Sequence, residues 1–190
     1  MLRLMLAAHL AAAPIPLERG TFWEYRESYT EPRGELDATT DELTRFEVRG
    51  TPEHPFLHQS GGSDPSPGPV EIGEGFMVLG PWTGEDGLPL PLKLGRVGPR
   101  IDGAAAWTVE EEEEVEVPAG RFLALRCALR APGAVAILWI VPGIGIVREA
   151  QGTGERGRRP LLERLLLRYG GPKEARGGPV RPPGAPRPAR

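Results

Sequence analysis

VEVPAGRFLALRCALR (residues 115–130) and AILWIVPGIGIVRE (residues 136–149) decide the fold class of this chain. Pro118-Ala119-Gly120 in the first stretch and Pro142-Gly143-Ile144-Gly145 in the second have the composition of tight turns. Short runs of apolar and β-branched residues flank both turns, which is typical of hairpins. The region Val115–Glu149 therefore predicts four short strands and indicates an antiparallel β domain.

The N-terminal part of the body continues this pattern. TFWEYRESYT (21–30) alternates in a way typical of a strand, and one face of that strand collects four side chains: Trp23, Tyr25, Glu27 and Tyr29. A turn follows at 31–34, and residues 35–49 predict one or two strands with a polar face. Residues 50–69 are rich in Pro, Gly, Ser and Asp, which predicts a loop.

The middle of the chain holds weaker strand signals. Residues 70–79 predict one weak strand with two glycines. LPLPLKL (88–94) has prolines at two positions, and proline cannot donate to a central ladder, so we expect an edge strand or an extended crossing segment. WTVEEEEEVEV (107–117) predicts a strand, because its apolar residues share one parity and a turn follows at once. Its glutamates would form the outer face, where like charges disfavour edge-to-edge pairing.

LLERLLLRY (161–169) fits a helical face as well as a strand face, and we interpret it as a closing strand. The 26 glycines and 22 prolines of the 190-residue chain favour many turns over long helices. Residues 16–170 therefore predict a single, all-β or mainly β domain, built as a curved antiparallel sheet or half-barrel.

The first 13 residues, MLRLMLAAHLAAA, have the pattern of a secretory signal peptide. Arg3 is the positive region, Leu4–Ala13 is a short apolar run, and Ala11–Ala13 offers an A-x-A cleavage site. The run is too short to span a bilayer as a helix, and we expect no transmembrane segment. The alternative is an N-terminal strand or helix of a cytosolic protein. We expect a periplasmic or secreted protein.

The C-terminal segment 171–190 holds six prolines, four glycines, five basic residues and one acid. Such a segment has little apolar surface to bury, so we expect a disordered tail. It is either a solvated appendage or a peripheral contact to an anionic surface such as lipid headgroups. The whole chain carries −3, and the tail and Arg3 together supply +5, so residues 16–170 carry −8. This acidic body argues against nucleic acid as its partner.

Cysteine and amide content is low. Cys127 is the single cysteine, so it forms no internal disulfide, and its alternation with leucines predicts a small buried side chain. The chain has no Asn and two Gln, which fits a heat-adapted protein, although a GC-rich genome gives the same arginine-over-lysine bias.

The usual catalytic and metal-binding motifs are missing from the sequence. It has no G-x-S-x-G, no phosphate-binding glycine loop, no C-x-x-C and no H-E-x-x-H. His54 and His58 are four residues apart, but Pro55 favours a loop over the helical face that a metal site would need. Glutamates 110–114 could be imagined as a calcium site, yet alternate side chains of a strand diverge. We expect no enzyme, no catalytic residue, no metal and no cofactor.

Three motifs resemble a group of poorly characterised bacterial envelope proteins. They are V-x-V-P-A-G-x-F-x-A-L-R (115–126), W-x-x-P-G-x-G-x-V-R (139–148) and G-x-x-W-x-Y (20–25), and LPLPLKLG resembles the segment before the central tryptophan of that group. The group is the TapB-like and related domains of unknown function. The resemblance implies a curved antiparallel sheet with the half-barrel shape of LolA-like lipoprotein carriers, and it brings no catalytic residues.

A curved sheet with one apolar concave face can hold an acyl chain or a partner segment. We therefore expect an exported, non-enzymatic binding protein of the cell envelope with an apolar ligand. Five residues are candidates for the ligand face, with core packing as the alternative role of each: Trp23, Tyr25, Phe122, Leu125 and Trp139. A structural or interaction subunit of an envelope assembly, joined by strand addition, is the second hypothesis. An unrecognised hydrolase is the third.

Overall fold

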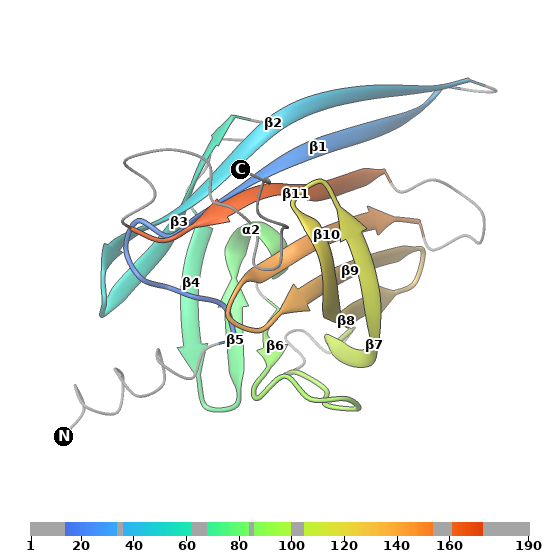
Figure 1. Ribbon diagram of the computed structural model, residues 1–190. Coiled ribbons are helices and arrows are strands. Elements are labelled where there is room, and N and C mark those ends of the chain that lie inside the picture. The colour runs from blue at the N-terminus through green and yellow to red at the C-terminus, as the bar shows by residue number, and fades with distance from the viewer. Residues whose placement is uncertain are drawn as a thin grey trace, which may run out of the picture.

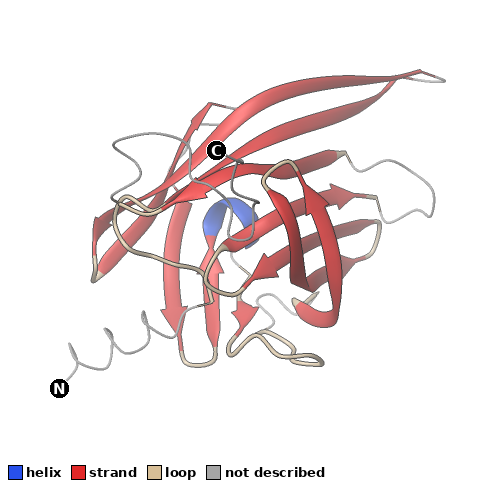
Figure 2. Cartoon of the chain, viewed as in Figure 1, coloured by secondary structure: helices blue, strands red, loops and turns tan. Residues whose placement is uncertain are grey.

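The computed structural model describes residues 14–33, 36–61, 68–83, 86–99, 105–153 and 161–172. In these parts of the chain the protein is one sheet of eleven strands with a single short helix, α2 (Gly80–Thr83) (Figure 1, Figure 2). None of the described helical residues forms a helix long and apolar enough to cross a membrane. The predicted signal peptide (1–13) and residues 173–190 of the predicted tail lie outside the described residues.

Every neighbouring pair of strands in the sheet is antiparallel. The order is β6-β5-β4-β3-β2-β1-β11-β10-β9-β8-β7. The strands are β1 (Phe22–Arg33), β2 (Leu36–Thr51), β3 (His54–Gly61), β4 (Gly68–Gly73), β5 (Phe76–Leu79), β6 (Leu88–Pro89), β7 (Thr108–Val117), β8 (Gly120–Ala131), β9 (Ala134–Val141), β10 (Gly145–Gly152) and β11 (Leu162–Gly170). The predicted mainly β, antiparallel class is confirmed, and 161–169 forms a strand. That strand lies at the centre of the sheet, between β1 and β10.

The two ends of the sheet approach each other, so that the sheet is nearly closed (Figure 1). After β6 the chain crosses to β7 and pairs with its edge. Gly95 N donates to Val109 O at 2.8 Å, Val109 N donates to Arg96 O at 3.0 Å, and Gly98 N donates to Trp107 O at 2.8 Å. The prediction for 88–94 was an edge strand or an extended crossing segment, and its first two residues form β6, which is the last strand in the order of the sheet.

The predicted hairpin turns are present at the ends of β7 and β9. Gly120, Gly143 and Gly145 have φ values of 138°, 82° and 116°, which lie in the region that favours glycine. A Cβ on Gly145 would lie 2.8 Å from Nε1 of Trp23, which itself donates to Ile144 O at 2.6 Å. The glycine thus lets β1 and the β9–β10 turn approach closely.

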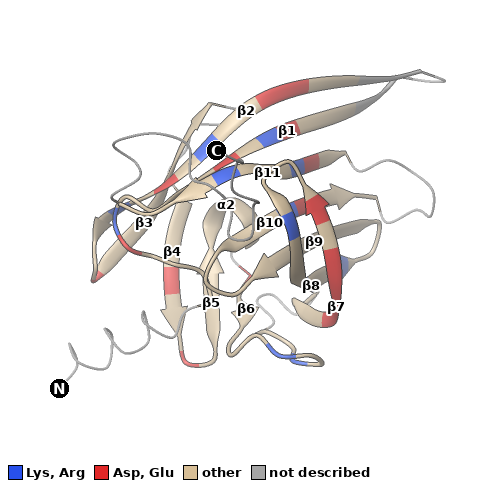
Figure 3. Cartoon of the chain, in the orientation of Figure 1, with Lys and Arg blue, Asp and Glu red and all other residues tan. Residues whose placement is uncertain are grey.

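Strand β7 carries a run of glutamates, most of them exposed, and β8 beside it carries arginines (Figure 3). Arg130 donates to both carboxylate oxygens of Glu110 at 2.9 and 3.0 Å, and Arg126 pairs with Glu111. The predicted strand is confirmed, but its glutamates do not form one outer face, because Glu112 pairs with Leu125 whereas Glu113 pairs with Ala124, so the two point to opposite sides. Cross-strand arginines offset the repulsion between the glutamates, a compensation that the sequence of β7 alone does not reveal.

Two sequence predictions for the region 50–79 are wrong. Residues 50–69 are not a loop throughout: 54–61 form β3, in which Leu57 and Gln59 face inward against β2. Residues 70–79 are not one strand, because a turn at Glu74-Gly75, where Gly75 has a φ of 82°, separates β4 from β5. The prolines of this region led to the loop prediction for β3, whereas pairing with β2 fixes its extended conformation. The sequence also did not predict α2, which places Trp82 in the core, where its ring centroid lies 4.5 Å from that of Phe46.

Candidate functional site

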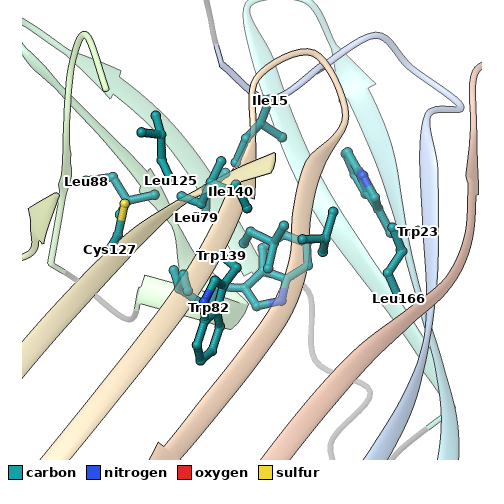
Figure 4. Close-up of a cluster of buried hydrophobic side chains, with 14 of the residues drawn as sticks. Ile15, Trp23, Leu79, Trp82, Leu88, Leu125, Cys127, Trp139, Ile140 and Leu166 are labelled. Carbon is teal, nitrogen blue, oxygen red and sulfur yellow. The ribbon is translucent and has the colours of Figure 1, made fainter. Parts of the chain in front are cut away.

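The five residues predicted to form a ligand face are all buried. Tyr25 is 0% exposed, and Trp23, Trp139, Phe122 and Leu125 are 1%, 7%, 9% and 9% exposed. They do not share one face of the sheet. Leu125 pairs with Ile140 whereas Arg126 pairs with Trp139, so Leu125 and Trp139 point to opposite sides. Figure 4 shows Trp23, Leu125 and Trp139 among the packed side chains of the core.

Trp139 is held by polar neighbours that the sequence did not suggest. Its indole N–H donates to Glu113 of β7, and the guanidinium of Arg148 lies 4.6 Å from the centroid of its ring. Phe122 packs edge-on against Tyr169 of β11, with centroids 6.5 Å apart. These contacts are those of core and interface packing. A ligand role for the five residues stays a prediction.

A buried ionic cluster lies between β1, β10 and β11. Arg164 donates from Nε to Glu27 at 2.6 Å and from Nη1 to Glu149 at 2.8 Å. Both glutamates are 0% exposed. Gln151 donates to the other oxygen of Glu149 at 2.6 Å, and the hydroxyl of Tyr29 donates to Glu27. Two carboxylates therefore share one guanidinium inside the sheet.

Burial raises the pKa of three groups in the core, two of them at or beside this cluster. Loss of solvent raises the pKa of the Glu149 carboxyl, and Arg164 offsets part of that shift. Loss of solvent also raises the pKa of Tyr25, whose hydroxyl donates to Ile146 O at 2.7 Å. Burial raises the pKa of Cys127 to about 12, so its thiol is not an activated nucleophile. The cluster links three strands and has no accessible surface at its two carboxylates.

An open groove of about 500 Å³ lies between β3 and β4. The lining residues are apolar or ring-bearing, with two acids and one histidine: Pro52, Glu53, His54, Pro55, Phe56, Pro69, Val70, Glu71 and Ile72. Phe56 is 36% exposed, whereas Val70, which also lines the groove, is buried. The groove is thus an apolar, partly acidic surface at the margin of the core.

The groove exists because β3 and β4 separate after two residue pairs, Phe56 with Pro69 and Leu57 with Gly68. A longer ladder would bring Pro55 and His54 to the β4 edge. Pro55 has no N–H, and the N–H of His54 donates to Thr51 Oγ1 at 3.3 Å, so neither supplies a donor to β4. Beyond that point Val70–Gly73 pair only with β5.

The start of β4 is fixed against α2. A Cβ on Gly68 would overlap the ring of Pro81, and a Cβ on Gly80 would overlap the ring of Pro69. These close contacts leave no room for a side chain at Gly68 or Gly80. Sequence reasoning missed this groove because it treated 50–69 as a loop. The alternation of buried Leu57 and Gln59 with outward Phe56 and His58 was the signal that could have revealed it.

His54 and His58 lie on the same outward face of β3. Because a strand rises about 3.3 Å per residue, residues four apart are separated by about 13 Å, too far for one metal ion. In the described parts of the chain no three His, Cys, Asp or Glu side chains form a group that could hold a metal.

No family model matches the chain, and no curated protein matches it in sequence. Two crystal structures have a similar fold. One is a candidate exported protein with a YmcC-like fold from Bacteroides fragilis, 13% identical, covering 83% of this chain and 98% of its own, with a TM-score of 0.48. The other is a candidate lipoprotein from Parabacteroides distasonis, 16% identical, covering 82% and 97%, with a TM-score of 0.47. The resemblance to the TapB-like group stays a prediction.

Proposed function

We propose that the protein is an exported, non-enzymatic binding protein whose ligand is an extended apolar segment of a polypeptide, held in the groove between β3 and β4. The observation that carries this proposal is the separation of these strands beside an exposed aromatic ring, Phe56. The proposal of export rests on the signal-peptide pattern of residues 1–13.

The edge of β4 supplies the chemistry for a polypeptide ligand. In an antiparallel ladder every second residue directs both its N–H and its C=O away from the partner strand. Two of the four residues Val70–Gly73 therefore direct these groups away from β5, toward the groove side. An added strand can pair with them and place alternate side chains against Phe56 and Ile72.

The acidic groups favour a basic residue in that ligand. Glu71 is exposed and lines the groove together with Glu53. Their charge repels the carboxylate of a fatty acid, so the groove suits a polypeptide better than an anionic acyl chain.

The character of the buried titratable groups supports a binding rather than a catalytic role. The thiol of Cys127 is buried with a raised pKa, and the carboxylates of Glu27 and Glu149 are both bound to Arg164. A general base or nucleophile must reach its substrate, and these groups do not reach the surface.

The test uses the full chain and two fluorescent probes, an alternating valine–arginine heptapeptide and a dansyl fatty acid, followed by anisotropy or emission. We expect saturable binding of the heptapeptide. Phe56→Ser should weaken it about tenfold, the effect of losing one aromatic anchor. Leu123→Ser is the matched control, because Leu123 is 60% exposed on β8, outside the groove.

Equal weakening by both substitutions, or no saturable binding of the heptapeptide, contradicts the proposal. Binding of the fatty acid alone, insensitive to Phe56→Ser, would instead favour the acyl ligand first expected at the five buried residues. Thermal unfolding of each variant shows whether a lost signal reflects a lost fold.

The unpartnered edge of β4 also favours the second candidate, a subunit of an envelope assembly that receives a strand from a permanent partner. The two candidates differ in the lifetime of the complex. A stoichiometric partner in protein purified from its native host, cross-linked to β4 through a residue introduced at Glu71, supports the assembly subunit.

A further inference from the structure

We propose that the occupant of the β3–β4 groove is the C-terminal segment of the same chain, residues 173–190. This inference rests on the proposed function, because it assumes that the groove binds polypeptide. The segment would lie along Pro52–Phe56 on one side and Pro69–Ile72 on the other.

The chemistry of the segment matches that of the groove. Residues 173–190 contain five prolines, five basic residues and one acid. Proline-rich segments favour the extended polyproline conformation, and they dock on aromatic surfaces at a small entropic cost because their φ angles are already fixed. The groove offers the Phe56 ring and the flat faces of Pro52, Pro55 and Pro69.

Charge complementarity favours the same pairing. Glu71 lines the groove and forms no ion pair with any residue in the described ranges. The body from 16 to 170 carries −8, and segment 173–190 carries five positive charges against one negative. Arg181 lies between Val180 and Pro182, and Arg187 lies between two prolines, so neither arginine has an acidic neighbour in the sequence.

The segment begins close enough to reach the groove. Pro172 lies against Gly20, where an added Cβ would be 3.3 Å from its Cα. Gly20 N donates to Val48 O at 2.8 Å, and Val48 pairs with Leu57, the residue after Phe56. Since neighbouring strands are about 4.8 Å apart, the path from Pro172 to β3 is on the order of 10 Å. The 18 residues that follow extend up to about 56 Å at 3.1 Å per residue.

The test compares the full wild-type chain with a full-length tail variant, Arg181→Glu/Arg187→Glu/Arg190→Glu. A fluorescent synthetic peptide with the sequence of residues 173–190 is titrated into each protein at low salt. A tethered segment has an effective concentration on the order of 1 mM, so a peptide affinity of about 100 µM predicts about tenfold weaker binding to the wild type. The affinity should fall as salt screens the charges.

Two further substitutions in the tail variant locate the site. Phe56→Ser and Glu71→Gln should each weaken peptide binding, whereas Leu123→Ser should not. Equal binding to the wild type and the tail variant overturns the proposal, and so does binding that Phe56→Ser and Glu71→Gln leave unchanged. Binding of the peptide only to vesicles containing phosphatidylglycerol overturns it in favour of an anionic membrane surface.

The same experiment separates this inference from the proposed function. If the valine–arginine heptapeptide binds the groove of the tail variant and the tail peptide does not, the proposed function stands and the inference fails. If the tail peptide binds and the heptapeptide does not, the inference stands and the groove binds the tail of its own chain rather than an apolar segment of another polypeptide. An elution volume that falls and a mass that rises with the concentration of the wild type, with neither change in the tail variant, would show that the tail binds a second copy and would overturn the same-molecule assignment.

Discussion

Nε of Arg164 on β11 lies 2.6 Å from Oε2 of Glu27 on β1, a residue 137 positions earlier in the chain. The same guanidinium binds Glu149 of β10 at 2.8 Å, and all three side chains are almost completely buried. One arginine thereby connects three neighbouring strands at the centre of the sheet, where the N-terminal and C-terminal halves meet.

Removal of the arginine should destabilise the fold strongly. Arg164→Met leaves two buried carboxylates without their cation, which costs about 3–5 kcal/mol of unfolding free energy. Urea denaturation measures the loss. Arg168→Met on the same strand is the matched control, because Arg168 pairs with Glu24 at the surface and such pairs contribute at most about 1 kcal/mol. Similar losses of unfolding free energy in both variants would show that the buried cluster contributes no more to stability than a surface ion pair.

The pKa of Glu149 gives the cluster a pH dependence of known sign. Burial raises the folded-state pKa of Glu149, Arg164 offsets part of that shift, and the negative charge of Glu27 adds slightly to it. A group with a raised pKa in the folded state contributes stability below its ordinary pKa, and this contribution is lost as pH rises through the raised value. The loss has a limiting slope of about 1.4 kcal/mol per pH unit for one proton.

Glu149→Gln removes this titration, so the stability of wild type relative to Glu149→Gln should fall from pH 4.5 upward. Urea midpoints of both proteins between pH 4.5 and 8 measure the difference. A wild-type advantage that grows with pH would mean that Arg164 dominates burial and lowers the pKa instead.

The sequence indicated the position of Glu27 in the strand but did not indicate that Arg164 is its partner. Alternation along 21–30 placed Glu27 on the face of Trp23 and Tyr25, and that face is the buried one. Arg164 could not be assigned as its partner, because the pairing of β1 with β11 depends on contacts between segments more than a hundred residues apart. The hairpins of 115–149 were predictable for the opposite reason, since each turn and its two strands are contiguous. The groove depends on the path of β4 past α2, which is again non-local.

The turn between β7 and β8 provides a local test. Gly120 has a φ of 138°, a conformation that β-branched side chains avoid, so Gly120→Val should cost about 1 kcal/mol or more. Arg121→Val introduces the same side chain one residue later, in ordinary strand conformation, and should cost less. Thermal unfolding of both variants compares them. A tolerated Gly120→Val would mean that the turn relaxes to a different conformation.

Export predicts a defined mature N-terminus. Cleavage after Ala13 should leave Pro14 as the first residue. The body accommodates this start, because Ile15 is 1% exposed and Gly143 N donates to Pro14 O at 2.8 Å. Mass spectrometry of the protein from its native host should show a chain shorter by about 13 residues in the envelope fraction. An intact N-terminus in the cytosol contradicts export.

Substitutions at Trp139 test whether this residue packs in the core or binds a ligand. Its side chain is 7% exposed, donates to Glu113 and stacks under Arg148, so Trp139→Ala should cost about 3–5 kcal/mol as a core truncation. Leu123→Ala, at a residue 60% exposed on the neighbouring strand, is the control and should cost far less.

The milder variant Trp139→Leu keeps enough stability for titration with a dansyl fatty acid. If the buried face holds an acyl chain, this variant weakens acyl binding by more than its stability loss explains. Unchanged acyl affinity, or no acyl binding by the wild type, assigns Trp139 to the core and leaves the β3–β4 groove as the ligand site.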